Sequence, residues 1–506
     1  MRTNMTRLVA LLLALLMLAG TLALVSCGDA TEQPPEDETP EQQPPDDGAI
    51  EEDPRIPLDY LPTDTYGGEQ INILEWTVDD HVPGDTWVPW EEIDVDLGDG
   101  DPINNVIYDR NGVVEETYDV VITKEYLSIN GSPAYTTAFR ANETTGDQAY
   151  QMITLRTTNI LSLCMENLMT NMFELPNLHT DMPWWNADSV VSYTMGDALF
   201  FAAPEMLLRD KGATAAMYYN QVIADNEGIE DLYALVAAGE WTQEVMIELS
   251  ENVTADMDGD DLVSSAEDMY GLAGSKRSIP FHMYAGTGNK LAQINDEGYL
   301  ELNFGDDESI MMWQDMLDYV MYSDYYTENM KDSALIPSDF NFFTSDHALF
   351  YIDMVKTAMR LRNMESNYGV LPLPKYDEYQ DEYASLVWMH HDCVLGIPAS
   401  CTNTDVISVV LEHMSYISYY DVYPVFYDTI ILGKSARDAQ SKEMLELIFR
   451  TRSFDPGQYW LDSVLGSTLL TLFEKGQKNI SSVWASVTIQ TETALEEFNE
   501  KVDELR

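Results

Sequence analysis

The sequence predicts an α/β protein, because apolar runs with the two-residue period of strands alternate with runs that have the period of amphipathic helices. The chain has 506 residues, of which 45% are hydrophobic and 11% are aromatic, and this is enough apolar side chain for a large core or several domains. No internal repeat of fixed period is present in the sequence. We therefore expect helices that pack on sheets along most of the chain.

The expected strands and helices begin near residue 70 and continue past residue 439. Five runs have the pattern of strands: 70–76, 120–125, 147–155, 197–201 and 347–354. An amphipathic helix precedes the second strand, and two further helices follow Trp241 and Ala439. The helix after Trp241 places four apolar side chains on one face: Val245, Met246, Leu249 and Val253. Such a face allows a helix to pack on a sheet.

Residues 1–27 have the three parts of a secretory signal. Two arginines precede the apolar run 8–25, and small residues follow it. The tetrad 24–27, with the sequence LVSC, resembles the bacterial lipobox. That resemblance implies cleavage before Cys27 and attachment of lipid to Cys27, which would hold the protein on the extracytoplasmic face of the cell membrane. The apolar run is also near the lower limit of a membrane span, so a retained anchor helix is the alternative.

Residues 28–66 are rich in Pro, Glu and Asp and contain one basic residue, Arg55. Their few apolar side chains offer too little burial to offset the entropy of ordering the segment. Proline and like-charge repulsion keep such a segment extended. We expect a disordered tether that holds a folded body away from a membrane.

The chain is strongly acidic, with 26 basic and 88 acidic residues and a formal net charge of −62. A chain of this charge repels nucleic acid and anionic lipid headgroups, so we expect no nucleic-acid partner. The acidic surface favours solubility and makes calcium binding easier.

The chain has four cysteines, one of which is Cys27. If lipid occupies Cys27, an odd number remains, namely Cys164, Cys393 and Cys401, so complete pairing is excluded. A bridge between Cys393 and Cys401 and a set of three buried thiols are both open at this point.

Three blocks of the sequence resemble the extracellular solute-binding proteins of family 1, which are the lipid-anchored receptors of bacterial ABC importers. The first block, 217–261, contains YYN, then an acidic helix, then GEWT, which opens the next helix. The second and third blocks are 367–385 and 431–457. Because the lipobox, the tether and the blocks follow the order typical of the family, the resemblance spans nearly the whole chain. It is greatest to the large variants from Gram-positive anaerobes.

The resemblance implies a two-lobed fold of the type II periplasmic-binding-protein class, with a hinge of crossing strands. Lobe 1 would comprise 67–216 and 369–423, and lobe 2 would comprise 217–368 and 424–506. A monomeric receptor of this kind closes its lobes on a solute and delivers it to the permease subunits of an ABC importer. An oligosaccharide is the solute that the family and the aromatic content favour.

Sugar binding requires aromatic rings that stack on C–H faces and planar polar groups that bond hydroxyls. The chain has 10 Trp and 29 Tyr, and the ligands of open α/β lobes lie outside the carboxyl ends of strands. Position relative to the expected strands and loops selects nine candidates: Glu75, Trp76, Arg156, Trp184, Trp185, Asp353, Trp388, Asp392 and Trp460. We expect Trp184 and Trp185 to be exposed in a loop near the cleft. Core packing or a surface ion pair is the alternative for each residue.

The sequence contains none of the common catalytic signatures, so we expect that the protein is not an enzyme. It lacks the serine-elbow, HExxH, phosphate-loop and dinucleotide-binding patterns. The adjacent histidines of the MHHD stretch, 389–392, would point to opposite faces of a strand and could not easily share a metal ion. Two other functions stay open: a surface lipoprotein that binds or cleaves glycans without a permease, and a receptor for peptides.

The loop 256–267 has the oxygen spacing of an EF-hand calcium loop. The expected ligands are the side chains of Asp256, Asp258, Asp260, Ser264 and Glu267 and the backbone carbonyl of Leu262. Asp261 replaces the glycine that normally makes the sharp turn, and Asp tolerates a positive φ better than most residues. We expect a structural calcium ion between a helix and a strand, remote from the cleft. An ordinary acidic surface loop is the alternative.

Overall fold

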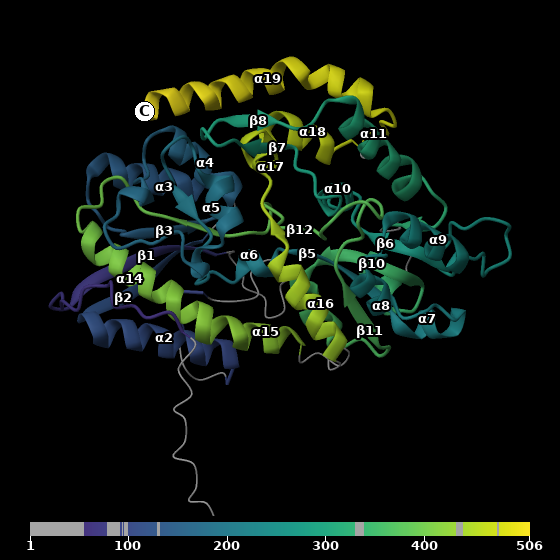
Figure 1. Cartoon of the computed structure of the whole chain (residues 1–506), viewed down its shortest axis with the longest axis horizontal. Helices are drawn as coiled ribbons and strands as arrows, with labels where there is room; N and C mark the ends of the chain where they lie inside the picture. Colours follow the sequence, from purple (N-terminus) through teal and green to yellow (C-terminus); the bar gives the residue numbers. More distant parts are fainter. Residues whose placement is uncertain are drawn as a thin grey trace, which may run out of the picture. The chain divides into compact units, whose positions relative to one another are not determined.

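The structure is a computed structural model of the whole chain (Figure 1). It describes residues 55–77, 92–93, 95, 100–128, 132–328, 339–431, 439–472 and 475–506. The residues from Pro57 to Arg506 form one compact unit. The signal segment, Cys27 and most of the predicted tether lie outside the described residues. Within the described ranges, no helix combines the length and the apolarity needed to cross a membrane.

The first of two five-stranded sheets has the strand order β2–β1–β3–β13–β4. Figure 1 labels its strands β1, β2 and β3. Its strands are β1 (Glu69–Thr77), β2 (Val120–Ser128), β3 (Met152–Leu155), β4 (Phe201–Ala202) and β13 (Val394–Gly396). β1 runs parallel to β2 and β3, whereas β13 runs antiparallel to β3 and β4. Ile71 and Ile73 of β1 are fully buried, as the alternating pattern of that run predicts.

The second five-stranded sheet has the order β11–β5–β10–β6–β9. Its strands are β5 (Ala215–Asn220), β6 (Tyr270–Gly274), β9 (Tyr326–Thr327), β10 (Ala348–Met354) and β11 (Tyr368–Leu371). β10 is parallel to β6 and antiparallel to β5, so the sheet is mixed. Every residue of β5, β6 and β11 is buried, which explains why these strands are apolar without alternation.

Helices separate the strands along the chain (Figure 1). Those before β6 are α2 (Pro102–Tyr118), α3 (Ser132–Thr145), α4 (Thr157–Met165), α5 (Ala187–Tyr193), α6 (Arg209–Gly212), α7 (Gln221–Glu227), α8 (Leu232–Ala238) and α9 (Gln243–Val253). Those between β6 and β13 are α10 (Ile279–Gly286), α11 (Asp307–Asp315), α12 (Asp339–Thr344) and α13 (Ala358–Leu361). A short hairpin of β7 (Ala292–Ile294) and β8 (Leu300–Leu302) lies between α10 and α11.

The helices after β13 are α14 (Thr404–Ile417), α15 (Tyr423–Ile431), α16 (Ala439–Arg450), α17 (Pro456–Trp460), α18 (Ser467–Leu470) and α19 (Ile480–Leu505). Packing follows the apolar faces: α14 lies against α2, α9 against β6, and α16 against β11. Cap residues define the ends, as at α2, where the Asp101 carboxylate accepts the N–H groups of Ile103 and Asn104. The last residue before β2, Asp119, adopts a φ of 50° and ends the same helix.

The chain passes between the two sheets in segments that we call the crossing segments, residues 203–214, 372–393 and β14 (Arg452–Ser453). They are hydrogen-bonded to one another. The N–H of Trp388 donates to the carbonyl of Ala213 at 3.0 Å, and the N–H of Val387 donates to that of Ser453 at 2.9 Å. β12 (Ser385–Leu386) pairs in parallel with β14. The fold therefore has the crossing strands that the sequence resemblance predicts for a hinge.

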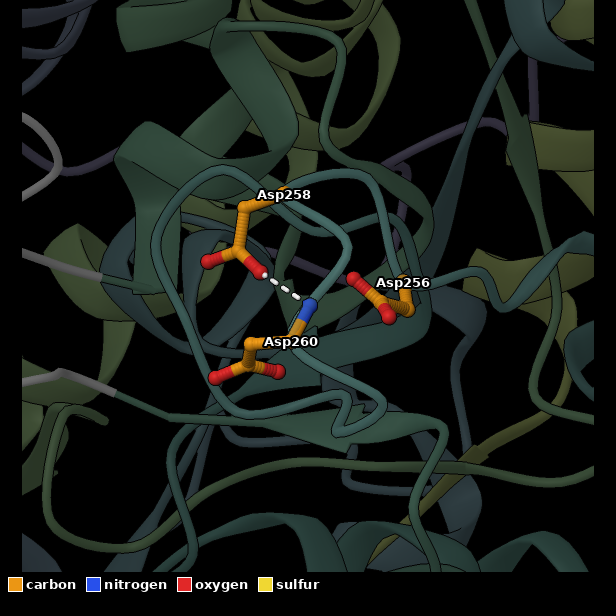
Figure 2. A group of neighbouring side chains, drawn as sticks. All are labelled: Asp256, Asp258 and Asp260. Carbon is orange, nitrogen blue, oxygen red and sulfur yellow. Dashed lines mark hydrogen bonds between the residues drawn. The ribbon is translucent and has the colours of Figure 1, made fainter.

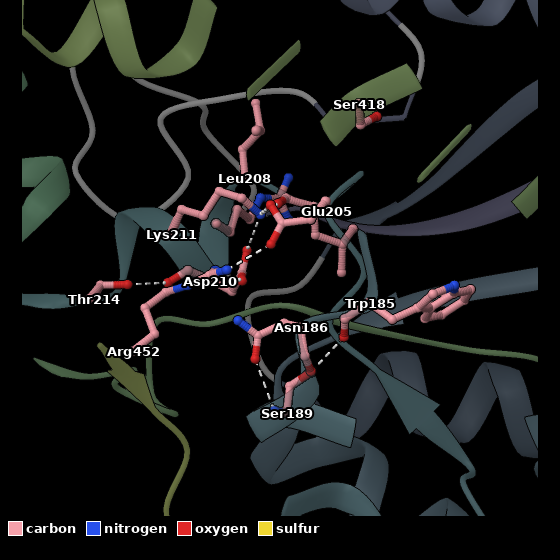
Figure 3. Close-up of polar contacts among 12 residues, drawn as sticks. Trp185, Asn186, Ser189, Glu205, Leu208, Asp210, Lys211, Thr214, Ser418 and Arg452 are labelled. Carbon is pink, nitrogen blue, oxygen red and sulfur yellow. Dashed lines mark hydrogen bonds and ion pairs between the residues drawn. The ribbon is translucent and has the colours of Figure 1, made fainter. Parts of the chain in front are cut away.

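Buried ion pairs hold the crossing segments together (Figure 3). The Arg452 guanidinium contacts the carboxylates of Glu205 and Asp210, both at 2.7 Å, and the Lys211 ammonium contacts Glu205 at 2.9 Å. None of these four side chains is more than 6% exposed. Burial alone would raise the pKa of Glu205, but Lys211 and Arg452 outweigh it and hold that pKa below its usual value.

Most of the predicted elements are confirmed, with two strands shortened. The run 147–155 is a strand only over β3, residues 152–155. The runs 70–76, 120–125 and 347–354 lie in β1, β2 and β10, and the helices after Trp241 and Ala439 are α9 and α16. The run 197–201 is wrong as a strand except at its last residue. Residues 195–198 form a tight turn instead, in which Met195 and Ala198 exchange backbone hydrogen bonds and Gly196 takes a φ of 58°.

The predicted tether is too long at its C-terminal end, because the compact unit begins at Pro57 rather than after Tyr66. The ring of Tyr60 lies 4.2 Å from that of His179, and its hydroxyl donates to the Glu412 carboxylate at 2.8 Å. Leu61 is buried beside it in sequence. These two side chains attach the described end of the acidic segment to the compact unit.

The cysteine alternatives are settled for the three cysteines that the structure describes. Cys164, Cys393 and Cys401 are all free and buried, so Cys393 and Cys401 do not form a bridge. All three pack in the interior, and the Cys401 thiol also donates to the side-chain oxygen of Asn403 at 3.1 Å.

We expect Arg452→Met to destabilise the protein by about 3–5 kcal/mol, because Glu205 and Asp210 would stay buried with Lys211 as their nearest cation. Urea unfolding followed by tryptophan fluorescence measures the change. The control is Lys501→Met, which breaks the pair with Glu504, whose side chain is 69% exposed, and should cost less than about 0.5 kcal/mol. Equal midpoints for both variants would show that the buried network does not stabilise the fold.

Candidate ligand-binding site

A cavity of about 460 Å³ lies where strands of both sheets end. Its lining residues are Arg156, Ser275, Arg277, Ser278, Asp353, Met354, Trp388, His390, His391 and Leu470. Arg156 follows β3 of the first sheet, Ser275 follows β6 of the second, and Met354 ends β10. We call this space the strand-end cavity. It occupies the place where ligands bind in open α/β sheets, beyond the carboxyl ends of the strands.

Local structure explains how the basic side chains reach the cavity. Arg156 is the N-cap residue of α4, with the extended backbone that connects a strand to a helix. Arg277 lies in the short connection from β6 to α10, between Ser275 and Ser278. Because strand–loop–helix connections place their loops at the strand's carboxyl end, both arginines come to the same cavity from different sheets.

Trp388 is the aromatic residue of the cavity wall. Its side chain is held by three rings, with centroid distances of 5.2 Å to Phe281, 5.4 Å to His282 and 4.9 Å to His390. It is 4% exposed, so a small part of the indole is presented to the cavity and the rest is packed. A ring fixed in this way loses little entropy when a ligand stacks on it.

His390 and His391 line the cavity as neutral imidazoles. Burial, with the charges of Arg156 and Arg277, lowers the pKa of His390 to about 4. Burial and the Lys356 ammonium hold the pKa of His391 well below its usual value. The Lys356 ammonium lies 2.6 Å from His391 Nδ1, and because ammonium has no lone pair, Nδ1 is the acceptor. At neutral pH both rings therefore offer hydrogen bonds rather than charge.

Two carboxyl groups near the cavity have different surroundings. Asp353 lines it and accepts hydrogen bonds from the hydroxyls of Tyr351 at 3.1 Å and Thr357 at 2.7 Å. Asp392 is buried and accepts the N–H of Thr157 at 3.1 Å and the Thr157 hydroxyl. Burial raises the pKa of Asp392 to about 7, although the bonds from Thr157 act in the opposite direction. Asp392 is thus partly protonated near neutral pH.

The structure brings three of the predicted ligand-binding residues together and separates the others. Arg156, Asp353 and Trp388 line the strand-end cavity. Asp392 is buried, and it directly follows His391, which lines the cavity. Trp460 lines a different cavity of about 320 Å³, between α4, α17 and α19. The backbone of Trp76 is in β1, and its side chain lies outside the described part of the structure.

The expectation that Trp184 and Trp185 are exposed is wrong. Both are 0% exposed, in the short helix η2 (Pro183–Trp185), and their indole N–H groups donate to the Glu412 carboxylate at 2.9 and 2.8 Å. Glu412 lies in α14, far away in the sequence, and it supplies the partner that allows two indoles to be buried. Glu75 is also fully buried and pairs with Arg209 at 3.1 Å.

Sequence reasoning missed several residues of the cavity, notably Arg277, His390 and His391. Residues 275–278 follow the strand β6, so the strand-end rule that selected Arg156 would have found them. The interpretation of 389–392 as part of a strand is wrong. The N–H groups of His391 and Asp392 both donate to the Trp388 carbonyl, and this turn directs both imidazoles to one cavity.

The loop 256–267 connects α9 to β6, the helix and the strand that the sequence predicts on its two sides. The carboxylates of Asp256, Asp258 and Asp260 lie together, with one oxygen of each within 4.8 Å of the others (Figure 2). Asp261 has a φ of 68°, the conformation expected at the position of the missing glycine. The loop precedes β6 and the strand-end cavity follows it, so the two sites lie at opposite ends of that strand.

Glu267, the fourth predicted carboxylate ligand, does not join this cluster in the described structure. Glu267 is exposed, and its N–H donates to the Ser265 hydroxyl. The neighbouring Asp268 closes the loop instead, because its carboxylate accepts the N–H groups of Met257, Ser264 and Ser265. Burial would raise the pKa of Asp268, but these backbone bonds hold it below its usual value.

The fold is similar to that of solved solute-binding proteins. An ABC substrate-binding protein from Listeria monocytogenes, in complex with cycloalternan, aligns over 86% of this chain and 99% of its own, with 9% identity and a TM-score of 0.51. The GacH receptor of Streptomyces glaucescens, solved unliganded and with acarbose, aligns over 85% of this chain and 99% of its own, with 11% identity and a TM-score of 0.52. A sugar transporter protein from Rhizobium etli, in an open conformation, aligns over 86% of this chain and 99% of its own, with 13% identity and a TM-score of 0.54.

At these identities the comparison establishes the fold, which is the two-lobed α/β fold of periplasmic binding proteins. This confirms the predicted fold class. No protein-family model matches the sequence. No curated protein matches it either. The lobe boundaries inferred from the resemblance stay a prediction, although the strands of the first sheet come from 69–202 and 394–396 and those of the second from 215–371.

We expect the stability of Asp392→Asn to exceed that of the unmodified protein increasingly as the pH rises. The pKa of Asp392 is about 7 in the folded protein and 3.8 in the unfolded chain, so the unfolded chain binds fewer protons at this site between these pH values. The stabilisation from protonated Asp392 is therefore complete below pH 3.8 and is lost as the pH rises through 7. The difference should grow by about 1.4 kcal/mol per pH unit across that window. Urea midpoints at several pH values measure it.

A difference that does not change with pH would contradict this prediction, because it would mean that Asp392 stays ionised in the folded protein. Asparagine can still accept the Thr157 N–H and can donate to the Thr157 hydroxyl, so the variant keeps both contacts.

Proposed function

We propose that the protein is a solute receptor of an ABC importer and that it binds an oligosaccharide in the strand-end cavity. The observation that carries this proposal is the origin of the lining: Arg156 comes from the first sheet, Asp353 from the second, and Trp388 from the crossing segment between them. A solute in this cavity touches both lobes and the segment about which they would move. This is the arrangement that a closing receptor requires.

The chemistry of the lining suits a carbohydrate. The small exposed part of the Trp388 indole offers apolar surface for sugar C–H groups. Arg156, Asp353 and the histidines offer planar hydrogen-bonding groups for hydroxyls. Cycloalternan and acarbose, which are present in two of the compared structures, are both carbohydrates. These likenesses support the carbohydrate class and leave the individual sugar open.

The charge of the lining favours binding over glycan cleavage. Hydrolysis of a glycosidic bond by the usual mechanism requires two carboxyl groups across the bond. Among the described residues that line the cavity, Asp353 is the single carboxylate, and Asp392 is buried against Thr157. The receptor therefore acts without chemistry on its solute. It binds, closes and delivers the solute to permease subunits.

Lipid anchoring completes the proposal. The lipobox places the lipid on Cys27, and the acidic segment from residue 28 to the start of the compact unit at Pro57 links the anchor to the receptor. The receptor would thus work on the extracytoplasmic face of the membrane, beside its permease. Labelling with radioactive palmitate, lost in a Cys27→Ser variant, is the direct assay of this part.

We expect at least one neutral or acidic oligosaccharide to raise the melting temperature of the protein in a thermal-shift screen, because a ligand that binds only the folded state stabilises it. Trp388→Phe should weaken binding of that oligosaccharide by about threefold, because the smaller ring retains only part of a stacking contribution of about 1 kcal/mol. The matched control is Trp313→Phe, because Trp313 packs on the same Phe281 ring without lining the cavity.

Three results would contradict the proposal. Stabilisation by a peptide and by no sugar would show that the solute class is wrong. Release of reducing ends from a polysaccharide would favour a glycan-cleaving lipoprotein. An unchanged radius of gyration in X-ray scattering, with the bound oligosaccharide at saturation, would exclude lobe closure.

We also propose that the loop 256–267 binds a structural calcium ion. Asp256, Asp258 and Asp260 supply three clustered carboxylates, and Ca²⁺ prefers six to eight oxygen ligands. Glu267, Ser264 and the Leu262 carbonyl would complete the set after a local rearrangement of the exposed part of the loop. The ion would fasten the end of α9 to the start of β6.

We expect calcium to raise the melting temperature relative to EGTA and to leave oligosaccharide affinity within about twofold, because the loop and the cavity lie at opposite ends of β6. Asp258→Asn should abolish the calcium shift. Asp296→Asn, an exposed acidic residue in the turn between β7 and β8, is the matched control and should retain it. An unchanged melting temperature with calcium would leave an ordinary acidic loop as the correct interpretation.

A further inference from the structure

The apolar face of α9 is wider than its packing on β6 requires. Met246 is fully buried, whereas Val245 and Leu249, which lie one helical turn apart, are half-buried. Val245 and Leu249 line a surface groove of about 350 Å³, which we call the α8–α9 groove. Its opposite wall is also apolar and consists of Leu235 in α8 and Ile229 in the connection between α7 and α8.

Carboxylates surround these apolar walls. Glu227, Glu230 and Glu248 line the α8–α9 groove, and all three are exposed. No Lys, Arg or His occurs between residues 212 and 275, a range that contains every lining residue of the groove. Acidic surface is common on a chain with a net charge of −62, so it is the enclosed apolar wall that distinguishes this place.

An apolar centre with a polar rim is the composition typical of protein interaction sites. Half-buried aliphatic side chains on the walls of a groove lose their remaining contact with water when the side chains of a partner fill it. The groove has no lining residue in common with the strand-end cavity, so the proposed solute does not account for it.

Charge excludes two occupants that the chain itself offers. Residues 28–54 of the predicted tether include many acidic residues and no basic one. A two-fold contact between two copies through this face would bring the same carboxylates against each other. The complementary occupant is therefore a segment that combines aliphatic side chains with Lys or Arg.

We propose that the α8–α9 groove is a docking site for a basic amphipathic helix of the permease. Aliphatic side chains on one face of that helix fill the groove, and its Lys or Arg side chains lie beside Glu227, Glu230 and Glu248. The inference rests on the proposed function, because the permease is the partner that such a receptor contacts. All lining residues lie between β5 and β6 of the second sheet, so docking here does not require lobe closure.

The probe is a fluorescent helical peptide of leucine and lysine, with the leucines on one face. One control peptide has glutamate in place of lysine, and the other has serine in place of leucine. Fluorescence anisotropy should show that the leucine–lysine peptide binds the protein at least about tenfold more tightly than either control. Equal binding of the serine–lysine peptide would show that the acidic surface attracts any cation, and would overturn the proposal.

Leu249→Ser tests the groove, because it removes apolar wall and leaves every carboxylate in place. It should weaken binding of the leucine–lysine peptide at least about fivefold. Ile489→Ser is the matched control, since Ile489 in α19 is 75% exposed and does not line the groove, and it should leave the affinity within about twofold.

A second pair of variants changes charge at exposed positions, where folding is not at risk. Glu248→Gln should weaken binding of the same peptide by about threefold, and Glu492→Gln in α19 should leave it unchanged. Equal effects within either pair of variants would show that the peptide does not bind in the groove.

The failures of the two proposals are distinguishable. If an oligosaccharide binds and the leucine–lysine peptide does not, the docking inference is wrong and the receptor function stands. Displacement of the peptide by a saturating oligosaccharide would place the peptide in the strand-end cavity and would also overturn docking. If the peptide binds in the groove and no carbohydrate raises the melting temperature, the proposed solute is wrong and the docking site stands.

Discussion

The buried ion network of the crossing segments is the constraint on which the two-lobed structure depends. Arg452 must keep Glu205 and Asp210 within 2.7 Å, because a charged group left alone in this interior would be strongly destabilising. Arg452 belongs to β14, and the two acids belong to the segment 203–214. The network therefore fixes two crossings relative to each other, and the backbone bonds of Trp388 and Val387 add the third.

The crossing segments that this network holds together also position the strand-end cavity. The backbone of Trp388 bonds to Ala213 in the crossing, while its indole forms part of the cavity wall, and the following turn supplies His390 and His391. One short piece of chain is thus both hinge and wall. A change in the angle between the lobes necessarily moves the wall relative to Arg156 and Asp353, which lie at strand ends on either side.

Features that depend on neighbouring residues in the chain could be predicted from the sequence, whereas features that depend on a partner far away in the sequence could not. The strands β1, β2 and β10 follow from their apolar patterns, and Arg156 and Asp353 follow from their positions at strand ends. The loop at Asp261 was also predictable, since its conformation depends on its own residues. The burial of Trp184 and Trp185 was not, because Glu412, which makes it possible, is more than 200 residues away in the sequence. The ordering of Tyr60 depends on that same carboxylate.

Burial explains why arginine, rather than histidine or a carboxylate alone, sets the charge of the cavity. It brings the pKa of His390 down to about 4 and that of Asp392 up to about 7, so each moves toward its neutral form at neutral pH. Burial also lowers the pKa of Arg156, but the ordinary value for guanidinium is so high that the group stays protonated. Positive charge in a closed site is therefore retained by arginine after other ionisable groups have lost theirs. Arg156 and Arg277 follow strands of different sheets, so that charge lies where the strand ends of both sheets meet.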